Sequence, residues 1–226
     1  KARLEGETLA RRIQRDAAYA PARARCAPAC AAAAAAIHAT PLGTLPELPT
    51  ADAATQLDLY EAAYRGYGGG RPVFELAFST LRRRLPPPGP IRLVHGDFRL
   101  GNLMILPEGL SAVLDWELAH LGDPAEDLGW ICTPSWRFGA IDQPVGGIGA
   151  LEDLVNAYHA AGGDPSVSKE QVQFWTLFGS LKWGVMCLTM ANVFETGADP
   201  SVERAAIGRR ASETELDFLL MLQGRL

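Results

Sequence analysis

The residues most suited to chemistry lie in one short segment, residues 95–102, which reads His-Gly-Asp-Phe-Arg-Leu-Gly-Asn. Within it, the carboxylate of Asp97 and the carboxamide of Asn102 are five positions apart, so a short loop can turn both side chains inward. The later run Leu-Asp-Trp-Glu supplies a second carboxylate, Asp115. Oxygen donors from Asn and Asp suit Mg²⁺, which completes its shell with water and phosphate. The remaining aspartate can then accept or orient the proton of a hydroxyl group that attacks phosphorus.

Short apolar runs on both sides of this segment predict the strands that must position it. Residues 91–94, 103–106 and 111–114 are apolar and partly β-branched. The last two runs are separated by Pro-Glu-Gly, a turn signal, so we expect them to pair as a hairpin. Such a hairpin returns the chain and brings Asp115 beside the other two polar side chains.

The rest of the chain has mostly helical patterns, and a proline-rich run at 86–90 forms a stiff, non-helical connector. Thr8 is expected to cap the first helix. The fold class that this order predicts is mainly α with a small β-hairpin insertion that carries the site. The expected helices cover residues 8–18, 21–39, 52–67, 72–85, a stretch after 124, 151–161, 168–195 and 201–222.

The pattern His-x-Asp-x4-Asn followed by a second Asp resembles that of the protein-kinase-like superfamily. Gly96 and the Asp-Trp-Glu at 115–117 are similar to the aminoglycoside and choline phosphotransferase branch. More narrowly, His-Gly-Asp-Phe-Arg-Leu-Gly-Asn-Leu-Met and Leu-Asp-Trp-Glu-Leu-Ala-His-Leu-Gly-Asp-Pro resemble the kinase domains attached to some acyl-CoA dehydrogenases. The specific motif covers about residues 91–133, and a looser similarity reaches nearly both ends. The resemblance implies the C-terminal lobe of a kinase-like fold.

The resemblance also implies a role for each residue of the motif. Asp97 would be the catalytic base, while Asn102 and Asp115 would hold Mg²⁺ and, with it, the phosphates of ATP. His95 would brace the loop, and Asp127 would hold the backbone of the catalytic loop from a buried position.

Two further residues of the motif have less specific expectations. Arg99 stands two residues after the base, where many protein kinases carry a lysine near the γ-phosphate, so a similar catalytic role is implied. Glu117 either reaches a second metal ion or caps the following segment.

A complete kinase also needs a strand-borne lysine and a loop that covers the nucleotide. Lys169 and Lys182 lie in predicted helices after the metal-binding aspartate and do not fit that role. We therefore expect an N-terminal lobe to precede Lys1, and we expect the 226-residue chain alone to bind ATP weakly and turn over little.

The expected organisation is one kinase-like C-terminal lobe over residues 1–226. It is divided into a helical segment at 1–90, the catalytic and metal-binding loops at 91–133, and a helical substrate-side subdomain at 134–226.

The implied activity is phosphoryl transfer from ATP to the hydroxyl group of a small molecule, and a non-catalytic, pseudokinase-like binding domain is the alternative. An aminoglycoside acceptor would need clustered carboxylates, whereas the helices after Asp115 carry only scattered acids. The narrower resemblance instead points to a hydroxyacyl-type metabolite.

Composition excludes other classes of function. A net charge of −5 argues against a nucleic-acid-binding surface, and no run of about 18 apolar residues predicts a membrane-spanning helix. The four cysteines lack zinc or redox spacing, so we expect reduced, buried thiols and a cytoplasmic protein.

Several other polar and aromatic residues are expected to be structural. Asp123 precedes a predicted helix and suits a capping role. Lys182 is expected at the surface rather than facing the cleft. The remaining structural set comprises three histidines, His38, His120 and His159, and the core aromatic residues Phe174, Trp175, Phe178 and Trp183.

Overall fold

The structure is a computed structural model that describes residues 5–226, and the chain forms two compact units. Unit 1 comprises the chain up to Ala51 together with Pro88–Thr176. Unit 2 comprises Asp52–Pro87 together with Leu177–Leu226. These two units do not correspond to the three predicted segments, 1–90, 91–133 and 134–226, so the structure does not test that division and it stays a prediction.

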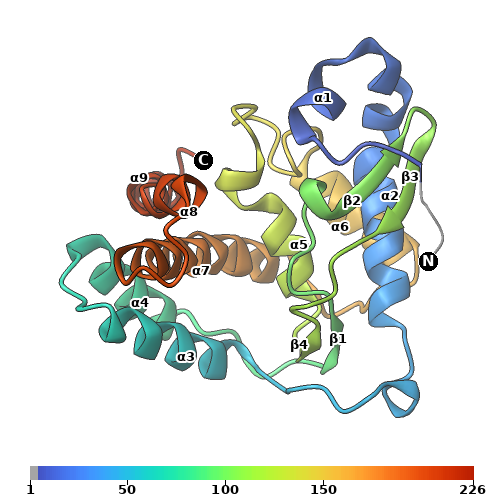
Figure 1. Ribbon diagram of the computed structural model, residues 1–226. Coiled ribbons are helices and arrows are strands. Elements are labelled where there is room, and N and C mark those ends of the chain that lie inside the picture. The colour runs from blue at the N-terminus through green and yellow to red at the C-terminus, as the bar shows by residue number, and fades with distance from the viewer. Residues whose placement is uncertain (1–4) are drawn as a thin grey trace. The chain divides into compact units, whose positions relative to one another are not determined.

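Unit 1 contains the motif predicted to be catalytic and is built around the long helix α2 (Figure 1). Alanine, the strongest helix former, dominates α2, and small buried side chains let α6 and β3 pack closely against it. Pro28 stands inside α2 without ending it. The α-helices of this unit are α1 (Ala10–Arg15), α2 (Ala20–His38), α5 (Ala125–Cys132), α6 (Leu151–Ala160) and the part of α7 (Lys169–Glu195) up to Thr176.

Two small antiparallel sheets complete unit 1. Strands β2 (Leu103–Leu106) and β3 (Gly109–Val113) form the predicted hairpin, with an irregular register between Met104 and Ile105. Strand β1 (Arg92–Val94) pairs with β4 (His120–Gly122), a strand that the sequence pattern did not predict. The mainly α fold with a small β insertion is therefore confirmed.

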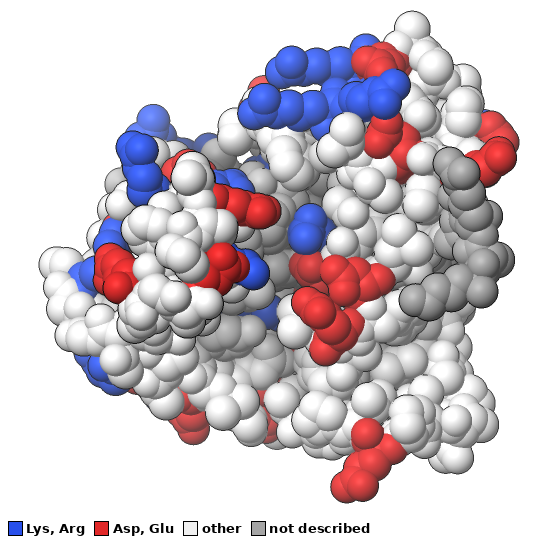
Figure 2. Space-filling view, in the orientation of Figure 1, with Lys and Arg blue, Asp and Glu red and all other residues white. Residues whose placement is uncertain are grey.

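Short 3-10 helices occupy several loops of unit 1, and charged side chains form small groups on its surface. Figure 2 shows one group of basic side chains over the part of the unit that carries α1, a helix with two arginines in its last turn. The 3-10 helices are η1 (Ala17–Tyr19), η2 (Leu42–Thr44), η3 (Leu100–Asn102) and η4 (Pro134–Trp136).

Unit 2 is entirely helical among its described residues. Asp52 begins α3 by accepting a hydrogen bond from the backbone N–H of Thr55 at 2.8 Å. The core of unit 2 contains aromatic side chains, and the ring centroids of Tyr64 and Phe74 lie 5.5 Å apart. An ion pair between Arg71 and Glu215 joins the start of α4 to α9. The helices are α3 (Ala53–Gly66), α4 (Pro72–Arg83), the part of α7 from Leu177, α8 (Val202–Gly208) and α9 (Ala211–Leu222).

Two expectations about helix ends were wrong. Thr8 does not cap α1; the carboxylate of Glu7 accepts the backbone N–H groups of Thr8 and Leu9 instead, at 3.0 and 2.9 Å. The expected helix at 201–222 is two helices, α8 and α9. The break follows Gly208, where a side chain would meet Ala191 of α7 at 2.8 Å, so close packing keeps a weak helix former at that point.

The long helix α7 also corrects one expectation. Lys182 is buried, with 4% of its surface exposed, so its expected surface position was wrong. Helix α7 is long and apolar enough to cross a membrane by length and composition alone. Half of its most apolar 18-residue stretch is buried inside the structure. A core helix of a globular domain has the same length and composition, so this pattern alone is weak support for a membrane span.

Most of the other structural expectations are confirmed, but Trp183 is only half-buried, so its expected place in the core is not. All four cysteines are free and buried. Phe174, Trp175 and Phe178 are also buried, and each expected structural histidine bonds to a neighbouring protein group rather than to clustered metal-type ligands.

Candidate active site

The catalytic motif forms a loop that directly follows β1. Val94, Phe98 and Leu100 are each fully buried and anchor the loop in the core of unit 1. The polar residues between these anchors have little freedom to move. The buried apolar residues of the loop thus hold in place the backbone that carries the proposed catalytic side chains.

The carboxylate of Asp97 is held by three side chains. Its Oδ1 accepts hydrogen bonds from Nε1 of Trp130 at 2.6 Å and from Nε of Arg99 at 3.0 Å. Its Oδ2 accepts a hydrogen bond from Nδ2 of Asn102 at 2.6 Å. The structure therefore brings Asp97 and Asn102 into direct contact across the loop.

The orientation of Asn102 matters for metal binding. Its Nδ2 donates to both the side chain and the backbone carbonyl of Asp97, the latter at 3.0 Å. Its Oδ1 has no hydrogen-bond donor among the described residues. This leaves an amide oxygen available as a ligand for a hard cation.

Asp115 directly follows Leu114, whose backbone is hydrogen-bonded to the end of the loop. The N–H of Leu114 donates to the carbonyl oxygen of Asn102 at 2.8 Å, so the end of the hairpin is fastened to the end of the loop. Asp115 follows with φ of 66°, a left-handed conformation that non-glycine residues adopt at a cost. Its exposed carboxylate has no ion pair or hydrogen bond within residues 5–226.

His95 ties the loop to the hairpin. Asp97 donates its backbone N–H to Nδ1 of His95 at 3.2 Å, which makes that nitrogen an acceptor. The opposite nitrogen, Nε2, then carries the proton and donates to the carbonyl oxygen of Leu114 at 2.9 Å. His95 is fully buried, so this bridge is shielded from water.

Asp127, in the first turn of α5, holds the backbone of the loop through hydrogen bonds. Its two oxygens accept the backbone N–H groups of His95 and Gly96 at 2.8 and 2.9 Å. His38 of α2 also contacts this carboxylate, with Nε2 at 3.1 Å from Oδ2. Asp127 is fully buried, so these donors replace the water that a carboxylate needs.

Gly96 is required by both conformation and space. Its φ is +80°, and a Cβ at this position would collide with the backbone carbonyl oxygen of Leu118. A Cβ at Gly101 would collide with the guanidinium of Arg99, the far end of a flexible side chain, so a side chain there would displace Arg99 rather than the loop. The two glycines of the motif therefore allow the loop to close on the hairpin and Arg99 to lie along it.

Arg99 and Glu117 differ in how firmly they are held. The guanidinium of Arg99 contacts Asp97 and lies 4.7 Å from the ring centroid of Trp136, a cation–π distance. Glu117 is exposed in the turn between β3 and β4 and caps no segment through a hydrogen bond in the described part of the chain.

Three contacts of the site were not predicted from the sequence. Trp130 bonds to the carboxylate of Asp97, Trp136 stacks on Arg99, and His38 bonds to Asp127. A signal existed for Trp130 alone: it follows Asp127 by three residues on α5, which puts both side chains on one face of the helix.

The oxygen donors at this junction fit Mg²⁺ chemically. Carboxylate and amide oxygens with room for water and phosphate are the ligands that this ion prefers. The described residues contain no group of three His, Cys, Asp or Glu side chains gathered as a metal site. The carboxylates of Asp97, Asp115 and Glu117 are therefore not gathered as a metal site by themselves.

Asp123 and Trp175 add a second tie at the start of α5. Oδ1 of Asp123 accepts the backbone N–H of Ala125 at 2.9 Å, as a capping residue does, and Oδ2 accepts Nε1 of Trp175 at 2.8 Å. Burial raises the pKa of Asp123 above its ordinary value, despite these two donors. The capping role expected for Asp123 is confirmed.

Known proteins share parts of this chain. Mouse (Mus musculus) acyl-CoA dehydrogenase family member 10 is 48% identical over 63 residues, which are 27% of this chain and 6% of that protein. Acyl-CoA dehydrogenase family member 11 of Pongo abelii is 30% identical over 141 residues, which are 58% of this chain and 16% of that protein. The matched region is thus a small part of each of these longer relatives.

A solved structure shares the fold. A candidate aminoglycoside phosphotransferase from Ralstonia eutropha JMP134 superposes with a TM-score of 0.71 at 22% sequence identity, and the match covers 96% of this chain and 69% of that one. This similarity confirms the expected kinase-like fold class of the aminoglycoside phosphotransferases.

The sequence profile of one family, described as the Phosphotransferase enzyme family (APH), matches residues 2–167. That range includes the loop, the hairpin and α5, and therefore every residue of the candidate site. Together with the acyl-CoA dehydrogenase family relatives, it confirms the resemblance found in the motif. The chain belongs to the Phosphotransferase enzyme family.

Proposed function

We propose that this chain carries the catalytic loop of an ATP- and Mg²⁺-dependent phosphotransferase that acts on a small-molecule hydroxyl group. One observation carries the proposal: Asp97 contacts Asn102 at 2.6 Å, and Asn102 is joined through its backbone to the residue before Asp115. This backbone link brings the residue before Asp115 next to the loop that carries the other two oxygen-bearing side chains, which supports a shared site. Family membership supports the reaction class.

In this proposal, Asp97 orients the acceptor hydroxyl and takes its proton. The bond from Trp130 keeps Oδ1 in place, so the carboxylate is already oriented before the acceptor arrives. Oδ1 of Asn102 and the free carboxylate of Asp115 hold Mg²⁺, which when bound offsets the negative charge of the phosphates. Glu117, exposed beside Asp115, is proposed as a ligand of a second metal ion.

Arg99 is proposed to contact the transferred phosphoryl group. Its Nε bonds to Asp97, while the rest of the guanidinium lies over the ring of Trp136. A planar, always charged guanidinium is well suited to phosphate oxygens. The side chain of Arg99 would then contact both the carboxylate of Asp97 and the transferred phosphoryl group.

The acceptor we propose is a hydroxyacyl-type metabolite rather than an aminoglycoside. The names of the relatives that contain this segment, acyl-CoA dehydrogenase family members, support this choice. We further propose that the protein acts in the cytoplasm, and that a preceding N-terminal lobe supplies the nucleotide lysine in the whole protein, without which turnover is low.

The test uses the full-length protein with MgATP and a panel of hydroxyacyl compounds, hydroxylated metabolites and aminoglycosides, scored by transfer of labelled phosphate. We expect transfer to one acceptor class, and Asp97→Asn should lower turnover by roughly two to four orders of magnitude at unchanged melting temperature. Asp142→Asn is the matched control, because Asp142 is exposed and lies outside the site. Absence of any MgATP-induced thermal shift in the full-length protein would instead favour a non-catalytic binding domain.

A further inference from the structure

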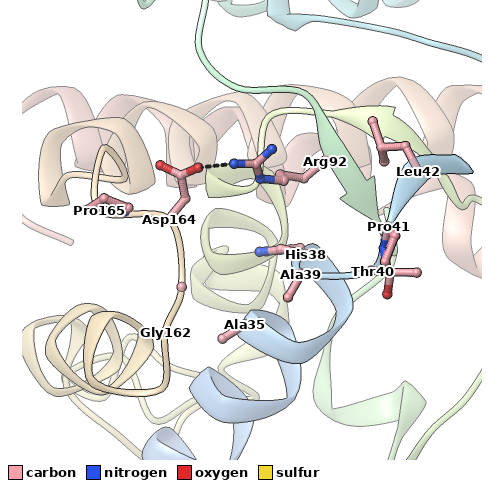
Figure 3. A pocket seen from close by; sticks show the side chains of 11 residues that line it. Ala35, His38, Ala39, Thr40, Pro41, Leu42, Arg92, Gly162, Asp164 and Pro165 are labelled. Carbon is pink, nitrogen blue, oxygen red and sulfur yellow. Dashed lines mark hydrogen bonds and ion pairs between the residues drawn. The ribbon is translucent and has the colours of Figure 1, made fainter.

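Unit 1 contains a pocket whose lining shares only His38 with the candidate active site (Figure 3). Its volume is about 390 Å³, within the range of roughly 300–1,000 Å³ that is usual for small-molecule pockets. The C-terminal end of α2 and the loop after it form one wall. Residue Arg92 of β1 and the loop between α6 and α7 form the opposite wall.

The polar part of the pocket offers hydrogen-bond donors rather than acceptors. Arg92 pairs with Asp164 at 2.8 Å, and the other oxygen of Asp164 already accepts the N–H and the hydroxyl of Ser166. Arg92 has five N–H donors, of which one reaches Asp164 and one reaches the carbonyl oxygen of Ile91. Its side chain is 41% exposed, against 11% for Asp164. The guanidinium therefore has unused donors to offer a ligand, while the carboxylate of Asp164 already accepts three hydrogen bonds.

Small and apolar residues form most of the rest of the wall, together with the ring of His38 and the side chain of Thr40. Ala35, Ala39, Pro41 and Pro165 line it, and Leu42 at its rim is 40% exposed. Gly162 adds no side chain, and the space where its Cβ would stand is open. A ligand here would meet a charged donor at one end and hydrocarbon along its body.

We propose that this pocket binds a small organic anion, with a carboxylate or phosphate group on Arg92 and a short apolar body against Pro41, Leu42 and Pro165. A charge-assisted bond to a guanidinium is about twice as strong as one between neutral groups, and the apolar wall adds burial of a short chain. A cation or a neutral alcohol of the same length lacks the group that uses the free donors.

A bound anion would also lie against a side chain that supports the catalytic loop. His38 lines the pocket, and its ring nitrogens bond to Tyr158 at 2.8 Å and to Asp127 at 3.1 Å. Burial raises the pKa of Tyr158 to about 12, so its hydroxyl keeps the proton that it donates to His38. The pocket therefore adjoins the buried network around Asp127 without touching Asp97, Asn102 or Asp115.

The experiment is calorimetric titration of the protein with hexanoate, phenyl phosphate, 1-hexanol and hexyltrimethylammonium. We expect the two anions to bind at least tenfold more tightly than the alcohol or the cation. The comparison between hexanoate and phenyl phosphate identifies which acidic group the site favours. Equal affinity for hexanoate and 1-hexanol, or no measurable binding of either anion, would overturn the proposal.

Three variants locate the binding site. Arg92→Gln should weaken anion binding about tenfold or more, in line with the loss of one charge-assisted bond. Ala39→Trp, at an exposed position on the wall, should fill the pocket and abolish binding while the protein stays folded. Arg11→Gln, at an exposed arginine of α1 that does not line the pocket, should change nothing. Unchanged anion affinity in Arg92→Gln or Ala39→Trp would place the binding elsewhere and refute the assignment.

Discussion

The indole N–H of Trp130 donates a hydrogen bond to Oδ1 of Asp97 at 2.6 Å, across 33 positions of sequence. Trp130 is 2% exposed and packs 5.3 Å from the ring of Trp136, which in turn lies under Arg99. Two buried tryptophans thus surround the proposed base and its arginine neighbour. The orientation of Asp97 depends on α5 as much as on its own loop.

Replacing Trp130 tests this dependence. Trp130→Phe keeps most of the ring volume but removes the donor, so Asp97 should lose its fixed orientation. We expect turnover to fall roughly 10- to 100-fold with little change in the KM for ATP, since a bond worth about 1.5–3 kcal/mol is lost. Trp183→Phe in unit 2 is the matched control and should leave turnover unchanged. Equal effects of both substitutions would contradict the specific role of Trp130.

Asp127 should matter for folding more than the proposed catalytic residues do. In Asp127→Asn, one backbone N–H of the loop would face an amide N–H₂ group, and His38 would lose a charged partner. We expect the free energy of unfolding to fall by about 3–5 kcal/mol, the range for a broken buried charge network. Denaturant unfolding measures this, and Asp142→Asn serves as the comparison because Asp142 is exposed and lies outside the network. A fully stable Asp127→Asn variant would show that the loop is held by other contacts.

Two glycines separate the effects of space and of backbone conformation. Gly96→Ala should destabilise the fold strongly, because its Cβ would meet the carbonyl oxygen of Leu118 at a left-handed φ. Gly139→Ala has a similar φ of +96° but open space around the Cβ, so it should cost only about 1 kcal/mol. Thermal unfolding of both variants measures the difference. Equal melting temperatures would contradict the prediction, because they would mean that the loop around Gly96 shifts away from Leu118 at little cost.

Asp115 is expected to trade stability for function. Its left-handed φ of 66° is one that glycine adopts without cost. Asp115→Gly should therefore fold with equal or slightly higher stability, by up to about 1 kcal/mol, while it loses Mg²⁺-dependent turnover. Thermal unfolding and a Mg²⁺ titration of activity together test this prediction. Normal activity in Asp115→Gly would remove Asp115 from the metal site.

The buried thiols predict a dependence of stability on alkaline pH. Burial raises the pKa of Cys132 to about 12, whereas an unfolded thiol titrates near 9. The unfolded state therefore loses its proton first, and the free energy of unfolding should decline as pH rises from about 9 towards 12. Denaturant unfolding at pH 8 and pH 10.5 measures the decline, and Cys132→Ala should make it shallower. An identical slope in Cys132→Ala would assign the decline to other groups.

Sequence spacing predicted the loop and hairpin well because both are local. The distance along the chain from Asp97 to Asn102 and the Pro-Glu-Gly turn determine which side chains can meet, and β2 and β3 form where their patterns indicate. The partners of this loop lie far away in sequence. Trp130, Trp136 and His38 reach the site only after α2 and α5 have packed, and no local pattern encodes that packing.

Strand β4 escaped prediction for a similar reason. Its sequence is His-Leu-Gly, too short and too polar to show alternation, and it is a strand only because β1 offers a partner. Lys182 was misjudged because charge suggested exposure, whereas its place on α7 is set by the apolar neighbours of that helix. Thr8 was expected to cap α1, but the helix begins only at Ala10 and its N-cap residue is Leu9, which makes no side-chain cap bond.

The interleaved course of the chain through its two units has a consequence during synthesis on the ribosome. Unit 1 is complete once Thr176 has emerged, whereas α3 and α4 of unit 2 must wait for the segment that begins at Leu177. At roughly 5–20 residues per second, the 50 residues from Leu177 to Leu226 take about 3–10 s to make. Throughout that interval the apolar faces of the two early helices, including Phe74 and Phe78, lack the nascent segments that cover them, so we expect chaperones to engage the chain there.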